Sequence, residues 1–466
     1  MSFPESIVQA LHAAPEKVVV EHGARTVTRA ELVTMMGRIA GGLRRSGLGP
    51  GRGVAMVVDV SAESLAAYLA AYTLGCRVIG VRPGLSERQQ AHVLRNGVDA
   101  VLDDQQVAAL LRGPANSLTI EARPSDIARV AYTSGTTGLP KGCAQTYRAM
   151  SAHWSWGHET WSQHTAELAA CAERYLLFGT LASAVVQDYL ALCLLGGGTA
   201  VIPEPDGTPL FPGVIERLRI TATIMNVPRL YQMLGDLRAS PMDTSSLRAM
   251  VVAGSPLTAH RLTEAVQVLG PVVHQAYGQT ETGGLTALTP HEIGAGVLTS
   301  VGRPLPGVRV DIRDNEIYVR NDYMMSEYLG DPAETADVLV DGWMRTRDLG
   351  YLDDDGYLYL TGRARDVIIV DALPVYAGPI ERVLCEHPDV DQAYVVGAPD
   401  DRRGEAVHAF IVPRADHAPD STVLSALVRT ELGESSVPQT YTVVPDAPIA
   451  ASGKPDKKAL MELYRR

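Results

Sequence analysis

The chain has 466 residues, of which 46% are hydrophobic and 20% are charged, and this is the balance of a globular protein with room for two or three folding units. A net charge of −12 without a long basic run argues against a nucleic-acid partner, and the lack of about 18 consecutive apolar residues argues against a membrane span. The 5 cysteines contain no Cys-x-x-Cys pair and the N-terminus lacks a signal-peptide pattern, so we expect a cytoplasmic protein without disulfides or a cysteine metal site.

In the first part of the chain, short apolar runs alternate with helical patterns. We expect strands at residues 18–20, 54–58, 78–81 and 100–102, and helices at residues 28–47, 62–74 and 86–94. The first of these helices begins with the capping-box spacing of Thr28 and Glu31. Strands separated by helices of this length predict βαβ units in a mostly parallel sheet.

A glycine-rich loop follows the polar segment 110–126. Residues 127–132 have the pattern of a short buried strand, residues 131–142 read Ala-Tyr-Thr-Ser-Gly-Thr-Thr-Gly-Leu-Pro-Lys-Gly, and residues 145–153 have a helical composition. Glycines let the backbone turn its N–H groups inward, hydroxyls add donors, and Lys141 supplies positive charge. The spacing is not that of a Walker loop, and an ordinary turn would not need this combination. We therefore expect the loop to bind a nucleotide phosphate.

The alternation resumes after the loop and then changes character twice. Helices are expected at residues 166–173, 184–195, 228–234 and 258–269, and strands at 175–178, 199–202, 222–225, 247–252 and 272–276. Between residues 301 and 360, short strands with tight turns predict a small barrel-like subdomain. Strands at 366–370, 390–397 and 406–412 and helices at 378–386 and 421–431 then predict a compact α+β unit. The charged segment 362–366 is the best domain boundary.

Three further motifs accompany the glycine-rich loop. Residues 275–281 read Gln-Ala-Tyr-Gly-Gln-Thr-Glu at the end of a strand, where ligands of α/β sheets collect. Residues 342–348 read Gly-Trp-Met-Arg-Thr-Arg-Asp, and Arg363 follows fifteen residues later. Near the C-terminus, residues 450–454 read Ala-Ala-Ser-Gly-Lys and offer one lysine on a flexible loop.

With these four motifs in this order, the chain resembles the adenylate-forming superfamily of acyl-CoA synthetases, nonribosomal-peptide adenylation domains and luciferases, and most of all a stand-alone acyl- or aryl-CoA ligase. The resemblance is collinear from about Thr28 to the C-terminus. It implies an α/β fold with a large N-terminal domain, residues 1–362, of mostly parallel sheets flanked by helices plus the barrel-like subdomain. It also implies a hinge at residues 363–366, with Arg365 as the pivot, and a small mobile α+β lid domain at residues 367–466.

The resemblance assigns many residues to ATP. The β- and γ-phosphates would be held by Thr133, Ser134, Gly135, Thr136, Thr137, Gly138 and Lys141. The nucleoside would be bound by Gly254, Ser255, Pro256, Tyr277, Gly278, Asp348 and Arg363. Among these, Tyr277 would stack on adenine, although simple core packing is nearly as good an interpretation of this residue. Asp348 would accept the two ribose hydroxyls with help from Arg363.

The catalytic residues that the resemblance implies are Lys141, Thr280, Glu281 and Lys454. Thr280 would donate to the α-phosphate, and Glu281 would hold Mg²⁺, a hard cation that prefers oxygen ligands. Lys454 would bridge the attacking carboxylate and the α-phosphate, whereas Lys457 and Lys458 are expected to be solvated. No general base is needed, because the attacking carboxylate is already ionised and the transition state mainly needs positive charge.

The sequence departs from the family pattern after the hinge. Relatives that form thioesters usually have a glycine, a proline and a glutamate where this chain has Ala372, Ala377 and Pro379. Because alanine does not adopt positive φ as glycine does, the thioester half-reaction is in doubt. A further departure is Arg347, which stands where glycine is usual.

The acid-binding residues are the least defined. Phe178, Gly179 and Thr180 lie where many relatives have an aromatic or histidine gate, and Gly284 is a further candidate for the pocket. Small residues there leave room for a bulky or flat substrate. No acidic residue occupies the position that amino-acid-activating relatives use, so we expect an aryl or acyl carboxylate rather than an α-amino acid.

The expected function is ATP- and Mg²⁺-dependent activation of a small carboxylic acid to an acyl-adenylate, followed by transfer to CoA or to the thiol of a separate carrier protein. A first alternative keeps adenylation but passes the activated oxyanion, which could include nitrite, to an amine or another non-thiol nucleophile. A second alternative is a non-catalytic AMP- or ATP-binding protein.

Overall fold

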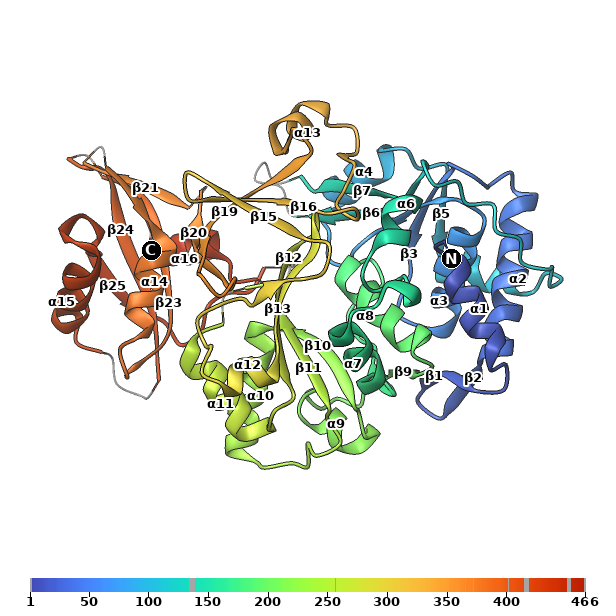
Figure 1. Ribbon diagram of the computed structural model, residues 1–466, viewed down its shortest axis with the longest axis horizontal. Coiled ribbons are helices and arrows are strands. Elements are labelled where there is room, and N and C mark those ends of the chain that lie inside the picture. Colours follow the sequence, from blue (N-terminus) through green and yellow to red (C-terminus); the bar gives the residue numbers. More distant parts are fainter. Residues whose placement is uncertain are drawn as a thin grey trace.

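The computed structural model describes residues 2–133, 139–255, 257–364, 366–371, 373–400, 402–414, 419–450 and 454–464. Figure 1 shows the N-terminal elements at one end of the long axis and the C-terminal unit at the other, with the remaining strands between them. None of the helices in these ranges combines the length and apolar composition that a membrane span needs.

The first sheet carries the strand that leads into the glycine-rich loop. Its strands, in spatial order, are β17 (Glu327–Tyr328), β7 (Lys141–Thr146), β6 (Ile127–Thr133), β4 (Arg77–Gly80), β3 (Gly53–Val57) and β5 (Ala100–Asp103). The four strands β6, β4, β3 and β5 are parallel, as the sequence predicts. Associated helices are α2 (Arg29–Arg45), α3 (Ala62–Thr73), α4 (Glu87–Arg95) and α5 (Asp104–Leu111). The capping box at the start of α2 is confirmed, because the Thr28 and Glu31 side chains each accept the other's backbone N–H.

One element of this sheet corrects the prediction. The sequence predicted a helix from residue 145, but β7 extends through Thr146 and only then does α6 (Tyr147–Ala152) begin, with Thr146 as its N-cap. β7 pairs antiparallel with β6 from Lys141 to Thr146, and Gln145 is buried in that pairing. Tertiary hydrogen bonding therefore overrides the helical composition of this segment.

The second sheet has nine strands. They are, in order, β14 (Arg303–Pro304), β13 (Gly283–Leu288), β12 (Val273–Gln279), β11 (Ala249–Ala253), β10 (Ala222–Asn226), β8 (Arg174–Leu176), β9 (Thr199–Ile202), β1 (Val18–His22) and β2 (Arg25–Thr28). One face packs into the core that includes α1 (Glu5–Ala13), α7 (Gln163–Cys171) and α8 (Ala184–Leu195). The other face packs with α9 (Gly213–Leu218), α10 (Val227–Ala239), α11 (Ala259–Leu269) and α12 (Pro290–Gly294).

The third sheet is antiparallel and corresponds to the predicted run of short strands. It contains β15 (Arg309–Arg313), β16 (Glu316–Arg320), β19 (Trp343–Leu352), β18 (Leu339–Val340) and β20 (Leu358–Arg363), with α13 (Pro332–Val338) beside it. One of its tight turns, at residues 353–356, is closed by a 3.0 Å hydrogen bond from the Gly356 N–H to the Asp353 carbonyl. In this sheet β19 and β20 pair Asp348 directly with Arg363.

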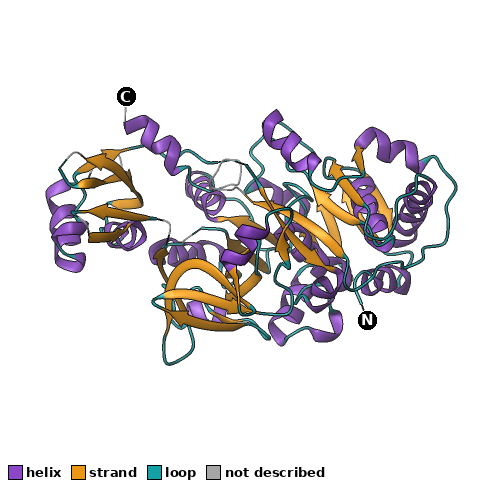
Figure 2. Cartoon of the chain, turned by 90° about the horizontal axis from the view of Figure 1, so that it is seen from above, coloured by secondary structure: helices purple, strands orange, loops and turns teal. Residues whose placement is uncertain are grey.

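The C-terminal unit has the α+β character that the sequence predicts. Its sheet contains β22 (Leu373–Tyr376), β21 (Val367–Val370), β24 (Gly404–Pro413), β23 (Val390–Asp400) and β25 (Thr440–Val443), with helices α14 (Ala377–Cys385), α15 (Ser421–Leu432) and α16 (Lys457–Tyr464). It has an apolar core of its own, formed by β21, β23, β24, α14 and α15. Figure 2 shows these strands and helices as a separate group at one end of the molecule.

Candidate active site

The carboxyl ends of parallel strands in both large sheets carry the predicted residues. β6 ends at Thr133, β11 ends just before Gly254, and β12 contains Tyr277 and Gly278. Eight residues of the sequence argument lie outside the described residues: Ser134, Gly135, Thr136, Thr137, Gly138, Pro256, Arg365 and Ala372. The candidate site is therefore built on Lys141, Glu281, Asp348, Arg363 and Lys454.

Asp348 is the most highly coordinated residue of the candidate site. Its Oδ2 accepts hydrogen bonds of 2.7 Å from the Tyr277 hydroxyl and 2.7 Å from Gln279 Nε2, and its Oδ1 accepts one of 3.0 Å from Arg363 Nε. The side chain is buried at 4% exposure. Burial, and next the charge of Asp348, raise the pKa of Tyr277, so its phenol remains a donor. These three hydrogen bonds hold the carboxylate in one orientation. About one of its four acceptor positions is left for the hydroxyl of a ligand.

Tyr277 and its neighbours occupy one end of β12. The register between β11 and β12 pairs Val252 with Gln275, which places Gly254 and Tyr277 at the same sheet edge. Gly254 has φ +97°, a conformation that favours glycine. A Cβ on Gly278 would come within 2.3 Å of a backbone oxygen, so glycine is required there as well. The ring of Tyr277 is buried in the core beneath the third sheet, which supports packing and orientation of Asp348 as part of its role.

Glu281 lies beside β7 and β17. The Tyr328 hydroxyl donates a 2.8 Å hydrogen bond to Glu281 Oε1, and burial together with the charge of Glu281 raises the pKa of the Cys143 thiol. In the parts of the chain that are described, no basic side chain forms an ion pair with Glu281, and Thr280 beside it has no partner for its hydroxyl. Those same parts hold no group of three or more metal-ligating side chains. A carboxylate without a described cationic partner nevertheless fits Mg²⁺, which commonly takes one or two carboxylates plus water oxygens and the phosphate oxygens of a substrate.

Lys141 is held by a network that the sequence did not predict. Its Nζ forms a 2.5 Å ion pair with Glu334 Oε1 of α13 and lies 5.3 Å from the centre of the Tyr328 ring. Arg347 Nη1 shares the same Glu334 oxygen at 2.8 Å and also pairs with Asp337. Arg347 adopts φ +60°, in the left-handed region, which is consistent with the glycine expected there. Its ion pairs with α13 offset the cost of that backbone conformation.

Lys454 comes from the C-terminal unit and reaches the residues of the other sheets. Its backbone carbonyl accepts a 2.8 Å hydrogen bond from the Ala450 N–H. The side chain is exposed, yet surrounding protein lowers its pKa, Arg363 lowers it further, and Asp348 and Glu281 oppose this effect. The charges of the two carboxylates thus favour the ammonium form of Lys454.

Lys457 does not behave as predicted. Instead of being solvated, its Nζ pairs with Glu381 at 2.8 Å and with Asp366 at 3.4 Å. Asp366 and Glu381 are separated in the sequence, so only the fold brings them to one lysine. These ion pairs connect α16 to Asp366 at the end of the predicted hinge and to Glu381 of α14.

The two parts of the predicted acid pocket are not joined by any contact among the described residues. Phe178 packs against Phe211 at a centroid distance of 5.4 Å, and the guanidinium of Arg229 lies 4.9 Å above its ring. Gly179 has φ +87°, and Thr180 Oγ1 caps the turn by accepting the Ala182 N–H.

Gly284 lies on the other side of the second sheet, against Trp154 and Tyr323. A Cβ on Gly284 would come within 3.0 Å of Trp154 Nε1, and the Gly284 carbonyl accepts a 2.8 Å hydrogen bond from the Tyr323 hydroxyl. Trp154 and Tyr323 also line a hollow of about 90 Å³, and Trp154 Nε1 is buried without a hydrogen-bond partner among the described residues. Trp154 could not be predicted from the sequence, because a single tryptophan gives no pattern.

A buried cluster of polar side chains is a further feature that no sequence motif predicts. Arg129 Nη1 pairs with Asp188 Oδ1 at 2.8 Å, and Arg129 Nε and Nη2 donate to Gln145 Oε1 at 2.9 and 2.7 Å. Trp156 Nε1 donates to the same Asp188 oxygen at 2.9 Å. His153 lies 3.5 Å from Asp188 Oδ2, and burial lowers its pKa to about 4, so the imidazole is neutral at pH 7.

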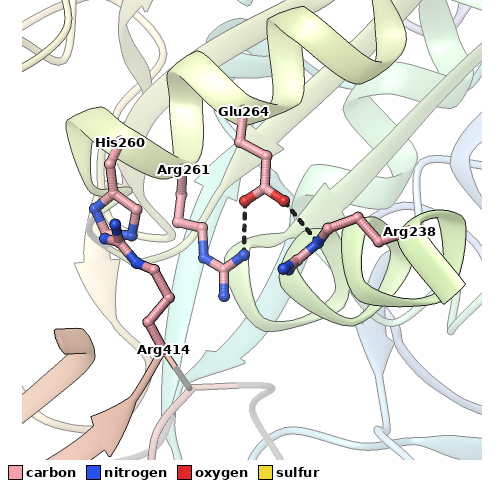
Figure 3. Close-up of a pocket in the computed structure, with 5 residues that line it drawn as sticks. All are labelled: Arg238, His260, Arg261, Glu264 and Arg414. Atoms are coloured by element: carbon pink, nitrogen blue, oxygen red, sulfur yellow. Dashed lines mark hydrogen bonds and ion pairs between the residues drawn. The ribbon is translucent and has the colours of Figure 1, made fainter. Parts of the chain in front are cut away.

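A second hollow, of about 230 Å³, separates the C-terminal unit from α10 and α11. Figure 3 shows its lining residues, which are Arg238, His260, Arg261, Glu264 and Arg414. Glu264 binds Arg261 at 2.7 Å and Arg238 at 3.0 Å, and Arg261 also pairs with Asp391 of β23. These contacts connect the C-terminal unit to α11. No residue of the candidate site lines this hollow.

Known proteins resemble this chain in both sequence and structure. The sequence pattern of the family described as AMP-binding enzyme matches residues 8–329, and that of the AMP-binding enzyme C-terminal domain matches residues 379–454. The chain is 30% identical to the fatty acid–[acyl-carrier-protein] ligase ScoC of Streptomyces coeruleorubidus, over 94% of this chain and 92% of that protein. It is also 30% identical to a feruloyl-CoA synthase of an Amycolatopsis species, over 96% of each chain. The amide bond synthetase McbA from Marinactinospora thermotolerans superposes with a TM-score of 0.83 at 33% identity, covering 98% of this chain and 99% of that one.

Proposed function

Because this chain belongs to the AMP-binding enzymes of the adenylate-forming superfamily, we propose that it uses ATP to convert a carboxylic acid into an acyl-adenylate and then transfers the acyl group to the thiol of CoA or of a carrier protein. The observation that carries the proposal is the carboxylate of Asp348, which Tyr277, Gln279 and Arg363 hold in one orientation with an acceptor position left for a ligand hydroxyl. The charges of Asp348 and Glu281 also favour the ammonium form of Lys454, a residue of the C-terminal unit.

The proposed chemistry divides among these residues. A carboxylate oxygen of the acid attacks the α-phosphorus of ATP, a new P–O bond forms, and the bond to the bridging oxygen breaks with release of pyrophosphate. Lys454 stabilises the negative charge shared by the incoming carboxylate and the α-phosphate, and Thr280 donates a hydrogen bond to the α-phosphate. Glu281 would hold Mg²⁺ together with the phosphates, and the ion would supply further positive charge. Lys141 faces the pyrophosphate portion.

The nucleoside is oriented by the third sheet. Asp348 accepts a ribose hydroxyl at its remaining acceptor position, and Arg363 and Tyr277 keep the carboxylate in place. Gly254, Ser255 and Gly278 line the base at the edge of β11 and β12. The C-terminal unit, residues 367–466, acts as a lid that turns about residues 363–366, with Arg365 as the pivot.

The acid is an aryl or acyl carboxylate in this proposal. The ScoC and feruloyl-CoA relatives act on a fatty acid and on ferulate, respectively, according to their names, and both classes lack an α-ammonium group. Trp154 and Tyr323 supply aromatic walls beside Gly284. The enzyme acts in the cytoplasm, where ATP, CoA and carrier proteins are available.

A second candidate function, in which an amine accepts the acyl group, is favoured by two observations. The solved structure at 33% identity is an amide bond synthetase, and residues 377 and 379 are alanine and proline where thioester-forming relatives usually have proline and glutamate. Adenylation is common to both candidates, so they differ only in the acceptor.

The proposal is tested by pyrophosphate exchange with a panel of aryl, fatty and amino acids plus nitrite. We expect exchange with at least one aryl or fatty acid. The accepted acid is then incubated with ATP and either CoA, a pantetheinylated carrier or an amine, and the acceptor is weighed by mass spectrometry. A mass increase on the thiol supports the first candidate and an amide product supports the second. Failure to exchange with the whole panel would instead indicate a nucleotide-binding protein without catalysis.

A further inference from the structure

Arg82 is a cation of the first sheet that the described chain leaves without a partner. It follows β4 by two residues, and its Nε is fully buried without a hydrogen bond. Arg29, Arg77 and Arg261 also bury an unbonded Nε, but each donates from another guanidinium nitrogen. Among the described residues, no hydrogen bond or ion pair reaches any nitrogen of Arg82. Arg82 as a whole is partly exposed, but its buried, unbonded Nε calls for an acceptor, because an unsatisfied buried donor is costly.

The sheet register shows which way Arg82 faces. β4 and β6 pair Ile79 with Val130, and continuing this register sets Arg82 level with Thr133, the last residue of β6. Val81 packs into the apolar cluster on one face of this sheet, and side chains alternate between the two faces. Arg82 therefore shares the opposite face with Cys143 of β7, a residue on which the charge of Glu281 acts.

Electrostatic couplings agree with this position. Burial lowers the pKa of Arg82, whereas Cys143 opposes that effect. Arg82 is also among the charges that lower the pKa of Lys454. The repulsion between these two cations from different domains is opposed by Asp348 and Glu281, and an anionic ligand between the cations would relieve it further.

A polyphosphate meets this requirement better than the acid substrate does. The acid brings a single negative charge and is expected against the second sheet, near Gly284. ATP and pyrophosphate bring several charges, and a guanidinium fork matches phosphate oxygens with two parallel hydrogen bonds. The chain is acidic overall, with a net charge of −12, so the few cations at this edge are needed to attract a polyanion.

We infer that Arg82 is an additional phosphate-binding residue, which contacts the β- and γ-phosphates of ATP and the released pyrophosphate. This inference rests on the proposed function, since it requires that ATP binds at the candidate site. It adds to the four motifs a residue that lies outside all of them.

The test compares ligands that do and do not contain the terminal phosphates. Binding of Mg·ATP, pyrophosphate and AMP is measured by calorimetry for the wild type, Arg82→Gln, Arg82→Lys and Arg88→Gln. Arg88 is a matched control, because it lies six residues away on α4 and is exposed. Arg82→Gln should weaken Mg·ATP and pyrophosphate by about 10- to 100-fold and AMP by less than about 2-fold. Arg82→Lys, which keeps the charge but not the fork, should lie between, and Arg88→Gln should bind as the wild type does.

Equal weakening of ATP and AMP, or no weakening of either, would overturn the inference alone. If Arg82→Gln does not fold, Arg82→Lys must still weaken ATP and pyrophosphate selectively, and a uniform effect in that variant counts against the inference. A wild-type protein that binds neither ATP nor AMP would instead overturn the proposed function.

Discussion

Two groups of charged side chains in this molecule contain similar residue types but are completed differently. In the buried cluster, Arg129 at 2% exposure donates three hydrogen bonds to Gln145 and Asp188, and Asp188 at 5% exposure also accepts from Trp156. At the candidate site, Arg82 has no described partner and Glu281 has no described cation. The chain itself neutralises the first group, whereas the second group is left for ligands to neutralise. Charged side chains that pair with one another support the fold. Charged side chains without a described partner indicate where a ligand binds.

The largest expected effect is on the buried cluster. Arg129→Met leaves Asp188 without its main cationic partner, so the free energy of unfolding should fall by about 3–5 kcal/mol. The loss is measured by urea denaturation followed by tryptophan fluorescence. The double variant Arg129→Met with Asp188→Leu removes both charges and should recover much of the lost stability. A fall of less than about 1 kcal/mol in the single variant would show that the cluster does not support the fold in this way.

Lys454→Ala should affect chemistry instead of folding. Removing the ammonium should reduce acid-dependent pyrophosphate exchange by about 10²- to 10³-fold, the loss typical of one charge-stabilising contact in the transition state. The melting temperature should stay near that of the wild type, because the side chain is exposed. Transfer from a synthetic acyl-adenylate to the acceptor should persist, since it bypasses the first step. Near-normal exchange would refute the role given to Lys454.

The buried cluster also predicts a pH dependence of stability. The pKa of His153 is about 4 in the folded chain and about 6.5 in an unfolded one, so protonation favours unfolding. Stability should be complete above about pH 6.5 and fall by about 3 kcal/mol as the pH is lowered to 4. His153→Gln should flatten this part of the profile. A variant with the same slope as the wild type between these pH values would contradict the assignment.

The smallest effect is expected for Arg347, which forms an ion pair with the same Glu334 oxygen as Lys141. In Arg347→Gly, the backbone at φ +60° is relaxed, but Glu334 loses its ion pair with Arg347 and keeps the one with Lys141. The KM for ATP should rise by about two- to fivefold, because Lys141 is then held more strongly away from phosphate. Glu334→Gln releases Lys141 and should change the KM in the opposite direction. If the KM for ATP changed in the same direction in both variants, Lys141 and Arg347 would not compete for Glu334.

Much of the fold follows from the sequence, because long apolar periodicities specify the strands of both large sheets and most of their helices. β7 was missed because Gln145 and its neighbours look helical and only pairing with β6 makes them a strand. The candidate site was predictable as far as motifs reach, which includes Asp348, Arg363 and Lys454. Arg82 could not be found that way, since a single arginine after a strand usually points to solvent. The Arg129–Asp188 pair likewise joins residues 59 positions apart, and no local pattern reveals it.

Formation of an acyl-adenylate is tested most directly by the products of one turnover without an acceptor. The wild-type protein is mixed with Mg·ATP and an accepted acid, then quenched and analysed by mass spectrometry. We predict equal amounts of pyrophosphate and an acyl-AMP ester, both missing in Lys454→Ala. Release of ADP and inorganic phosphate, or ATP that stays intact with every acid while remaining bound, would contradict the proposed chemistry.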